Sequence, residues 1–150
     1  MVLINRGKVE QVGTPESVYD YPGTPFVAHF LGSVNLFHGR VEEGRLHVGE
    51  HALSLGASAG RDGTAVAFVR PHEFDVVRGW EAGQGLPAKI VRLVSVGPSA
   101  QIELASEGGE LIEVSVDRET VRQLALAEGD AVSLCPRRIR VFPEPAFAAA

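Results

Sequence analysis

Apolar and polar residues alternate along most of the chain, at the two-residue period of strands that bury one face. Short strands at this close spacing, separated by glycine-containing turns, predict a mainly β fold built as a small barrel that is closed or partly closed. The predicted strands are residues 35–41, 45–48, 51–55, 64–70, 87–96, 100–106, 110–116, 131–136 and 137–142, of which 64–70 is a mostly apolar run that indicates a buried strand.

One helical segment interrupts the later strands. Asp117 stands at the N-cap position of the sequence RETVRQLAL, in which Val121, Leu124 and Ala125 have the spacing of one buried stripe. A single helix between late strands is typical of an OB-like barrel, which is the architecture that we predict.

The first 32 residues follow another pattern. Residues 1–12 read as a hairpin, and two short helices are predicted to begin at the Thr-Pro pairs 14–15 and 24–25. Elements this small bury too little surface to be stable alone, so we expect residues 1–32 to be the end of a larger domain. The second helix has one apolar face that carries Phe26, Val27, Phe30 and Leu31.

Composition and charge limit the classes of function. The chain has 150 residues, 45% of them hydrophobic, which fits one soluble domain with an appendage. Its net charge of -5 argues against a nucleic-acid partner. Cys135 is the only cysteine, so no disulfide forms within the chain. No apolar run approaches the roughly 20 residues of a membrane span, and no signal peptide is visible, so we expect a cytoplasmic protein.

The most concentrated polar cluster is the sequence VRPHEFDV, which directly follows an apolar run. The guanidinium of Arg70 and the imidazole of His72 can together hold an oxyanion such as sulfate, beside the carboxylate of Glu73. The alternative is structural: Pro71 ends the strand, Arg70 pairs with a neighbouring acid, and His72 and Glu73 shape a turn. The residues alone leave both interpretations open, and neither assigns a catalytic residue.

Other candidate sites have simpler interpretations. His38, His47 and His51 lie on consecutive strands, but no cluster of carboxylates or thiolates completes a metal shell, so we predict solvent-facing histidines and no metal site. Cys135 has no activating partner nearby in the sequence, which predicts a small buried side chain rather than a reactive thiol.

The most basic stretch is PRRIRV, residues 136–141. Alternation places Arg138 and Arg140 on one face of a strand, and Arg137 on the apolar side near the strand start. The stretch lacks the aromatic residues that stack on nucleic-acid bases, so we predict a face that is either solvated or paired at an interface.

The sequence GKVEQVGTPESVYDYPGTPFVAHFLGSVN, residues 7–35, resembles the junction between the nucleotide-binding domain and the C-terminal regulatory domain of ABC-importer ATPase subunits. The segments VRPHEFDV, PAKIVRLVSVGPSAQIEL and LAEGDAVSLCPRRIRVF are similar to the TOBE domain of the sulfate/thiosulfate subclass, with His72 where other subclasses more often have an acid. The resemblance implies a remnant of the nucleotide-binding domain at residues 1–32, a TOBE/MOP-like barrel at 33–143 and a tail at 144–150.

The resemblance also implies a regulatory and dimerisation domain without catalysis of its own. The sequence contains no phosphate-binding loop of the form GxxxxGK[ST], no ABC signature and no magnesium site, so we expect ATP and Mg²⁺ to bind a domain outside this chain. The implied partners are a second subunit, the ABC permeases at the inner membrane, and an oxyanion or another cytosolic regulator. An oxyanion-binding sensor for sulfate or molybdate is the alternative function. The residues implied in interdomain packing are Tyr19, Phe26, Phe30 and Leu31.

Overall fold

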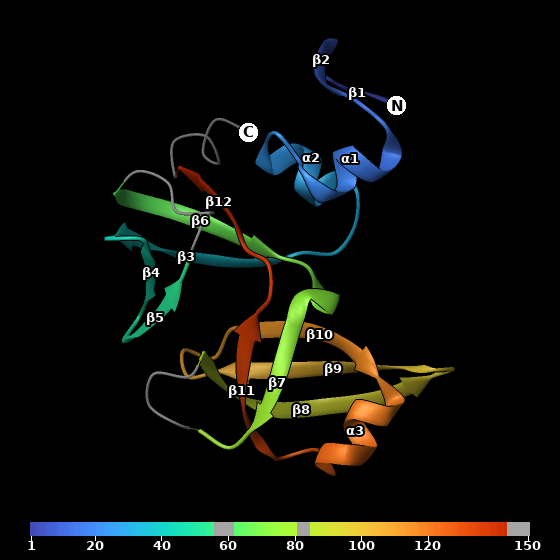
Figure 1. Cartoon of the computed structure of the whole chain (residues 1–150), viewed down its shortest axis with the longest axis vertical. Helices are drawn as coiled ribbons and strands as arrows, with labels where there is room; N and C mark the ends of the chain where they lie inside the picture. The colour runs from blue at the N-terminus through green and yellow to red at the C-terminus, as the bar shows by residue number, and fades with distance from the viewer. Residues whose placement is uncertain (56–61, 81–84, 144–150) are drawn as a thin grey trace.

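The computed structural model describes residues 1–55, 62–80 and 85–143. The predicted tail at 144–150 and parts of two glycine-rich loops therefore lie outside the described residues. Figure 1 shows three parts: a hairpin with two helices, an upper five-stranded sheet, and a lower five-stranded sheet that carries the third helix.

The N-terminal part has the elements that its sequence predicts. The Thr14 hydroxyl accepts a hydrogen bond from the Ser17 amide at 3.1 Å, and the Thr24 hydroxyl accepts one from the Val27 amide at 3.3 Å. Both caps satisfy amides that lack a partner within the helix, which confirms the predicted helix starts. The elements are β1 (Val2–Asn5), β2 (Lys8–Val12), α1 (Pro15–Asp20) and α2 (Pro25–Phe30).

The upper sheet has the strand order β12-β6-β3-β4-β5. Its last three strands form the antiparallel meander that their alternation predicts. Strand β6 buries both faces: Val66 and Phe68 pack with Ala28 of α2, while Ala67 and Val69 face the main core. The strands are β3 (Asn35–Glu42), β4 (Arg45–Val48), β5 (His51–Ser54), β6 (Gly63–Val69) and β12 (Arg140–Pro143).

The lower sheet has the strand order β10-β9-β8-β11-β7, with β10 and β7 as its two edges. The two sheets share one core, in which the ring of Phe37 meets the ring of Phe74 edge-on at 6.3 Å between centroids. The mainly β, OB-like fold is confirmed, but neither sheet closes on itself. The strands are β7 (Phe74–Arg78), β8 (Leu86–Val96), β9 (Ser99–Ser106), β10 (Leu111–Asp117) and β11 (Ala131–Pro136).

The Asn35 side chain, from β3 of the upper sheet, forms hydrogen bonds with the backbone of the edge strand β10. The buried Asn35 amide nitrogen donates to the Glu113 carbonyl at 2.7 Å, and the Asn35 amide oxygen accepts from the Glu113 amide at 2.8 Å. Because Asn35 offers one donor and one acceptor, it takes the place of a strand partner at Glu113. The contact blocks strand addition at this point and links the two sheets.

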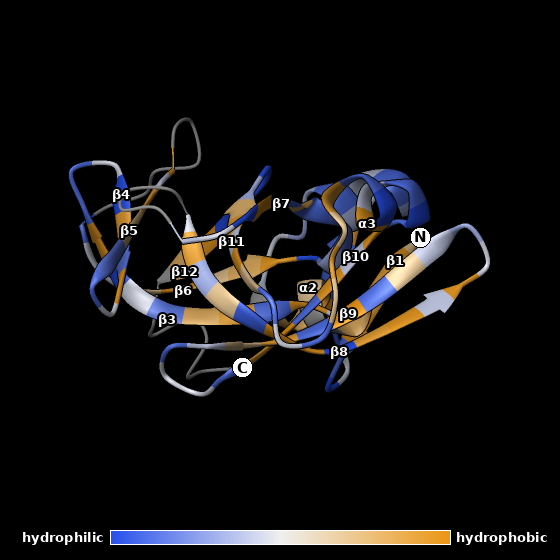
Figure 2. Ribbon diagram, turned by 90° about the horizontal axis from the view of Figure 1, so that it is seen from below, coloured by the Kyte–Doolittle hydropathy of each residue, from blue (hydrophilic) through white to orange (hydrophobic). Residues whose placement is uncertain are grey.

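Helix α3 (Arg118–Leu124) begins directly after Asp117, as predicted, although the Asp117 carboxylate makes no capping hydrogen bond. Val121 and Leu124 pack against the core, but the prediction for Ala125 is wrong because that residue is exposed. Ala125 ends the helix in the left-handed conformation, and the turn brings Leu126 into the core instead. The ribbon of α3 is mostly hydrophilic, whereas several strands carry hydrophobic bands (Figure 2).

Candidate functional site

The sequence that follows β6 folds into a single 3-10 turn, η2 (Pro71–Glu73). Pro71 occupies the first position of the turn, and the Glu73 amide donates to the Arg70 carbonyl at 3.0 Å. In return, the Glu73 carboxylate accepts a hydrogen bond from the Arg70 amide at 3.2 Å. These reciprocal bonds hold the Glu73 side chain in a fixed direction at the boundary between the two sheets.

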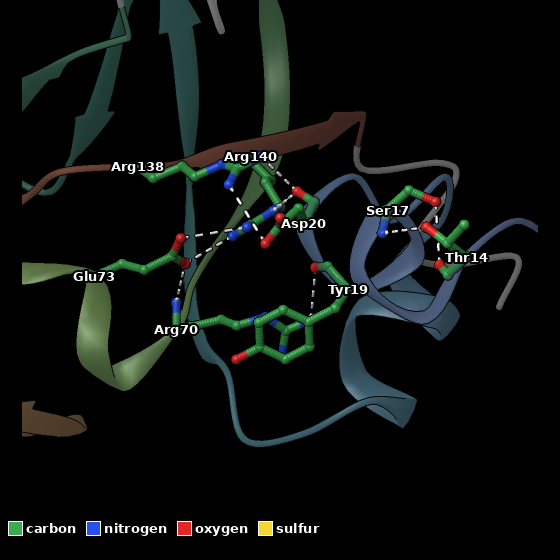
Figure 3. A network of polar contacts seen from close by, with 8 residues as sticks. All are labelled: Thr14, Ser17, Tyr19, Asp20, Arg70, Glu73, Arg138 and Arg140. Atoms are coloured by element: carbon green, nitrogen blue, oxygen red, sulfur yellow. Dashed lines mark hydrogen bonds and ion pairs between the residues drawn. The ribbon is translucent and has the colours of Figure 1, made fainter.

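Glu73 forms a bidentate ion pair with Arg140 at the start of β12 (Figure 3). The two N–O distances are 2.8 and 3.3 Å, and only 10% of the Glu73 side chain and 11% of the Arg140 side chain are exposed. Burial raises the pKa of Glu73, but the hydrogen bonds and charge of Arg140, with the Arg70 amide, outweigh this effect and hold the pKa below its usual value. Glu73 therefore stays ionised at neutral pH.

The end of helix α1 joins the same network. The Asp20 carbonyl accepts hydrogen bonds from Arg138 at 2.7 Å and from Arg140 at 3.0 Å. The Asp20 carboxylate lies 3.7 Å from Arg138, whose guanidinium also lies over the Tyr21 ring at 4.6 Å. Because the last carbonyls of a helix lack donors within that helix, the two arginines complete α1 while they attach it to β12.

Arg70 itself is directed at the N-terminal helices. Only 1% of the residue is exposed, and its guanidinium lies over the Tyr19 ring at 4.0 Å from the centroid. One terminal nitrogen donates to the Tyr19 carbonyl at 3.5 Å, while Nε and Nη1 have no hydrogen-bond partner among the described residues. Burial lowers the pKa of Arg70. The exposed His72 ring stacks on the same Tyr19 ring at 6.3 Å.

The structure thus places Arg70, His72 and Glu73 in one short segment, but their side chains have different surroundings. Arg70 is buried over the Tyr19 ring, His72 is exposed, and Glu73 is buried against Arg140. The predicted pairing of Arg70 with a neighbouring acid is wrong. The Glu73 carboxylate accepts a hydrogen bond from the Arg70 backbone amide, but it forms its ion pair with Arg140. The role of Arg140 was also missed. Alternation predicts the face of the strand on which Arg140 lies, but it does not predict which acidic residue pairs with it. The assignment of Arg137 to the apolar side is wrong too, since that residue is exposed.

The predicted interdomain residues differ in exposure. Leu31 and Phe26 are partly buried against a small cluster of Leu3, Val18 and Val27. Phe30 stacks on the Phe26 ring at 5.7 Å but is itself 62% exposed. The N-terminal part therefore has a small core of its own and still presents an aromatic side chain to the outside.

The candidate metal ligands and the cysteine occupy surface or half-buried positions, namely His38, His47, His51 and Cys135. Within the described residues, no three His, Cys, Asp or Glu side chains lie close enough together to hold a metal ion. His51 pairs instead with Glu107 at 2.8 Å, between the β4–β5 and β9–β10 turns. Burial, and then the charge of Asp75, raise the pKa of the Cys135 thiol, which keeps it protonated at neutral pH. No helix in the described ranges has the length and apolar character needed to cross a membrane.

Two protein-family models match the chain in succession. Residues 35–76 match the CysA C-terminal regulatory domain, and residues 81–137 match a TOBE-like domain. The two matches together cover the η2 turn and the strands of both sheets, except β12 and the end of β7.

Relatives with curated descriptions match nearly the whole chain. The sulfate/thiosulfate import ATP-binding protein CysA of Ralstonia nicotianae is 49% identical over 152 residues, and that of Nitrosomonas europaea is 41% identical over 150 residues. The Bacillus cereus protein of the same name is 42% identical over 146 residues. These alignments cover 96%, 97% and 95% of this chain but only 41%, 41% and 40% of the relatives, so the chain spans about two fifths of their length.

A solved structure supports the fold. The crystal structure of the cytoplasmic molybdate-binding protein ModG, with molybdate bound, superposes with a TM-score of 0.58 at 22% sequence identity. The match covers 73% of this chain and 95% of the ModG chain. With the two family models and the relatives in agreement, the chain is a C-terminal regulatory segment of the CysA type, in which a CysA C-terminal regulatory domain match is followed by a TOBE-like domain match.

Proposed function

We propose that this chain is the regulatory part of the ATP-binding subunit of a sulfate/thiosulfate importer, and that it acts through protein contacts rather than catalysis. The observation that carries the proposal is the buried network around Glu73, Arg140 and Asp20, which joins α1, η2 and β12. Its charged groups bind one another, so they fix the positions of α1, η2 and β12 relative to each other. None of these groups is left as a free base or nucleophile. In the intact subunit, ATP and Mg²⁺ bind the preceding domain, on the cytoplasmic side of the permeases.

The hairpin supplies a surface for that preceding domain. Leu3 points into the small N-terminal core, while the opposite face of β1 and β2 is apolar and open to solvent. An apolar face on a two-stranded hairpin is stable only when another surface covers it. We therefore divide the chain at residue 33 and assign residues 1–32 to the ATP-binding domain. The exposed residues are Val2 (54%), Ile4 (62%), Val9 (61%) and Val12 (67%).

A second apolar surface suits a second copy of the chain. Strand β8 pairs with β11 only from Leu86 to Lys89, so the outer part of β8 has β9 on one side and no strand on the other. Three valines of this part are exposed, namely Val91 (50%), Val94 (38%) and Val96 (60%). On this side the Leu93 amide donates to the Glu128 carboxylate at 3.4 Å, and no described strand pairs with the edge. A strand edge without a neighbouring strand, flanked by valines, favours association with another strand edge, and we propose a homodimer through β8.

Sedimentation equilibrium of the chain tests the dimer. We expect reversible dimerisation that Val96→Lys weakens by about tenfold or more, because the substitution places a charge in an apolar contact. Leu111→Lys is the matched control, since Leu111 is equally apolar and 70% exposed but lies at the other edge of the sheet. A chain that stays monomeric at high concentration, with its N-terminal helices ordered, contradicts the homodimer.

A second candidate function is oxyanion sensing, and one feature of Arg70 favours it. The buried guanidinium has two nitrogens without a hydrogen-bond partner among the described residues, and the fold is shared with a molybdate-binding protein. Calorimetry with sulfate, thiosulfate, molybdate and tungstate tests this function. Sub-millimolar binding that is lost in Arg70→Gln and weakened in His72→Gln supports it. If none of the four anions binds, oxyanion sensing is excluded and the protein-contact function stands.

A further inference from the structure

A pocket of about 650 Å³ is lined by residues of β7 and β10, the two edge strands of the lower sheet. Asn35 fills the gap at Glu113, so strand addition is blocked there and the gap stays open farther along β10. An opening of this kind suits a compact ligand better than an extended peptide. The polar residues that line it are His72, Asp75, Ser99, Ser115, Asp117, Thr120 and Arg137.

Opposite charges face this pocket from different elements. Arg137, from the segment between β11 and β12, donates to the His72 carbonyl and lies 3.4 Å from the Asp75 carboxylate. Asp117, at the start of α3, makes no capping hydrogen bond, and its carboxylate has no ion-pair partner among the described residues. The pocket thus combines a guanidinium that has further donors with a carboxylate that has no countercharge.

Hydroxyl groups complete the lining. Ser99, Ser115 and Thr120 come from β9, β10 and α3, and all three are half-buried. The Ser115 hydroxyl accepts a hydrogen bond from the Gln101 amide at 3.1 Å, so its own hydrogen is available to a ligand. Hydroxyls both donate and accept, and can therefore serve either end of a polar molecule.

From this arrangement we infer that the pocket binds a small zwitterion, a molecule that carries both a carboxylate and an ammonium group, such as an amino acid. The ligand carboxylate binds Arg137 beside His72, and the ammonium group binds Asp117. A free oxyanion fits poorly, because Asp75 and Asp117 outnumber the single guanidinium of Arg137 and repel it. A bound zwitterion connects the segment between β11 and β12 with the end of β10, so it stabilises the open sheet. This site goes beyond the protein-contact function and is separate from Arg70.

The test is isothermal titration of the whole chain with glycine, L-serine and glycylglycine at fixed pH and ionic strength. Acetate and ethylamine carry only one of the two charges, and sulfate represents an oxyanion. We expect saturable binding of the zwitterions, with acetate and ethylamine at least about tenfold weaker. Asp117→Asn and Arg137→Gln each weaken zwitterion binding by about tenfold or more.

Matched controls separate the site from general charge effects. Glu119→Gln and Arg122→Gln remove the same charges from exposed positions of α3 that do not line the pocket, and they leave affinity unchanged. If Asp117→Asn does not fold, the comparison of glycine with acetate on the unmodified chain gives the same information. The inference is overturned if no zwitterion binds the unmodified chain at millimolar concentration, or if acetate binds it as tightly as glycine does. Neither result affects the homodimer.

Discussion

The buried ion pair between Glu73 and Arg140 joins the lower sheet to the upper one, and removing its negative charge tests that role. Glu73→Gln keeps the shape of the side chain and one acceptor for the Arg70 amide, but it leaves Arg140 without a countercharge. Loss of one partner from a buried ion pair costs about 3–5 kcal/mol of unfolding free energy, and we expect about 3 kcal/mol because Gln retains an acceptor.

Urea unfolding, followed by far-UV circular dichroism and Trp80 fluorescence, measures this cost. For a chain of this size, about 3 kcal/mol corresponds to a fall in Tm of roughly 6–12 °C. The matched control is Glu119→Gln, which breaks an exposed pair with Arg122 at 3.6 Å and is expected to cost less than about 0.5 kcal/mol. The double variant with Arg140→Gln should cost less than the sum of its single changes, by at least about 1 kcal/mol.

The same pair predicts a pH dependence. Because the pKa of Glu73 is lower in the folded state than its usual value, ionised Glu73 contributes stability above the unfolded pKa of about 4.3. That contribution is lost as the pH falls through the lower folded pKa. The stability difference between the unmodified chain and Glu73→Gln should therefore be full at pH 6 to 7 and shrink in acid. A Glu73→Gln variant as stable as the Glu119→Gln control, or a difference that does not shrink, would refute the reasoning.

Three further predictions concern other contacts. Asn35→Ala should cost about 1–3 kcal/mol in urea unfolding, because the amide and carbonyl of Glu113 lose their partner; a cost near zero contradicts the edge contact. Gly39→Ala should cost about 1–3 kcal/mol because its Cβ meets the His47 carbonyl of the neighbouring strand, whereas Gly108→Ala, which meets only a distant hydroxyl, should change stability little. Cys135 should react slowly with a thiol reagent at neutral pH and faster as the pH rises; a rate equal to that of free cysteine at pH 7 contradicts its raised pKa.

Local patterns were sufficient for most elements of this fold, although β7 (Phe74–Arg78) was not among the predicted strands. The Thr14 and Thr24 caps and the alternation in Ile102 and Leu104 act within a few residues of the chain, so the sequence predicts them directly. Ala125 shows the limit of periodicity, since the helix ends one residue before the stripe does.

Long-range contacts were not accessible in the same way. Glu73 and Arg140 are 67 residues apart, and Asn35 and Glu113 are 78 residues apart, so nothing local assigns one to the other. The open edges of β7 and β10 likewise depend on how all five strands assemble. The sequence therefore predicted that Arg70, His72 and Glu73 form a distinctive cluster, but it did not reveal that Glu73 and Arg140 bind each other inside the fold.

The central claim is that this chain serves as the regulatory part of a sulfate/thiosulfate import ATPase subunit. The most direct measurement replaces the matching two fifths of the Ralstonia nicotianae relative with this chain and follows sulfate uptake in cells that lack the relative. We expect that uptake is restored, and that Ile4→Lys in the exposed hairpin face abolishes it without unfolding the chain. A chimera that folds and binds ATP but supports no uptake would contradict the claim.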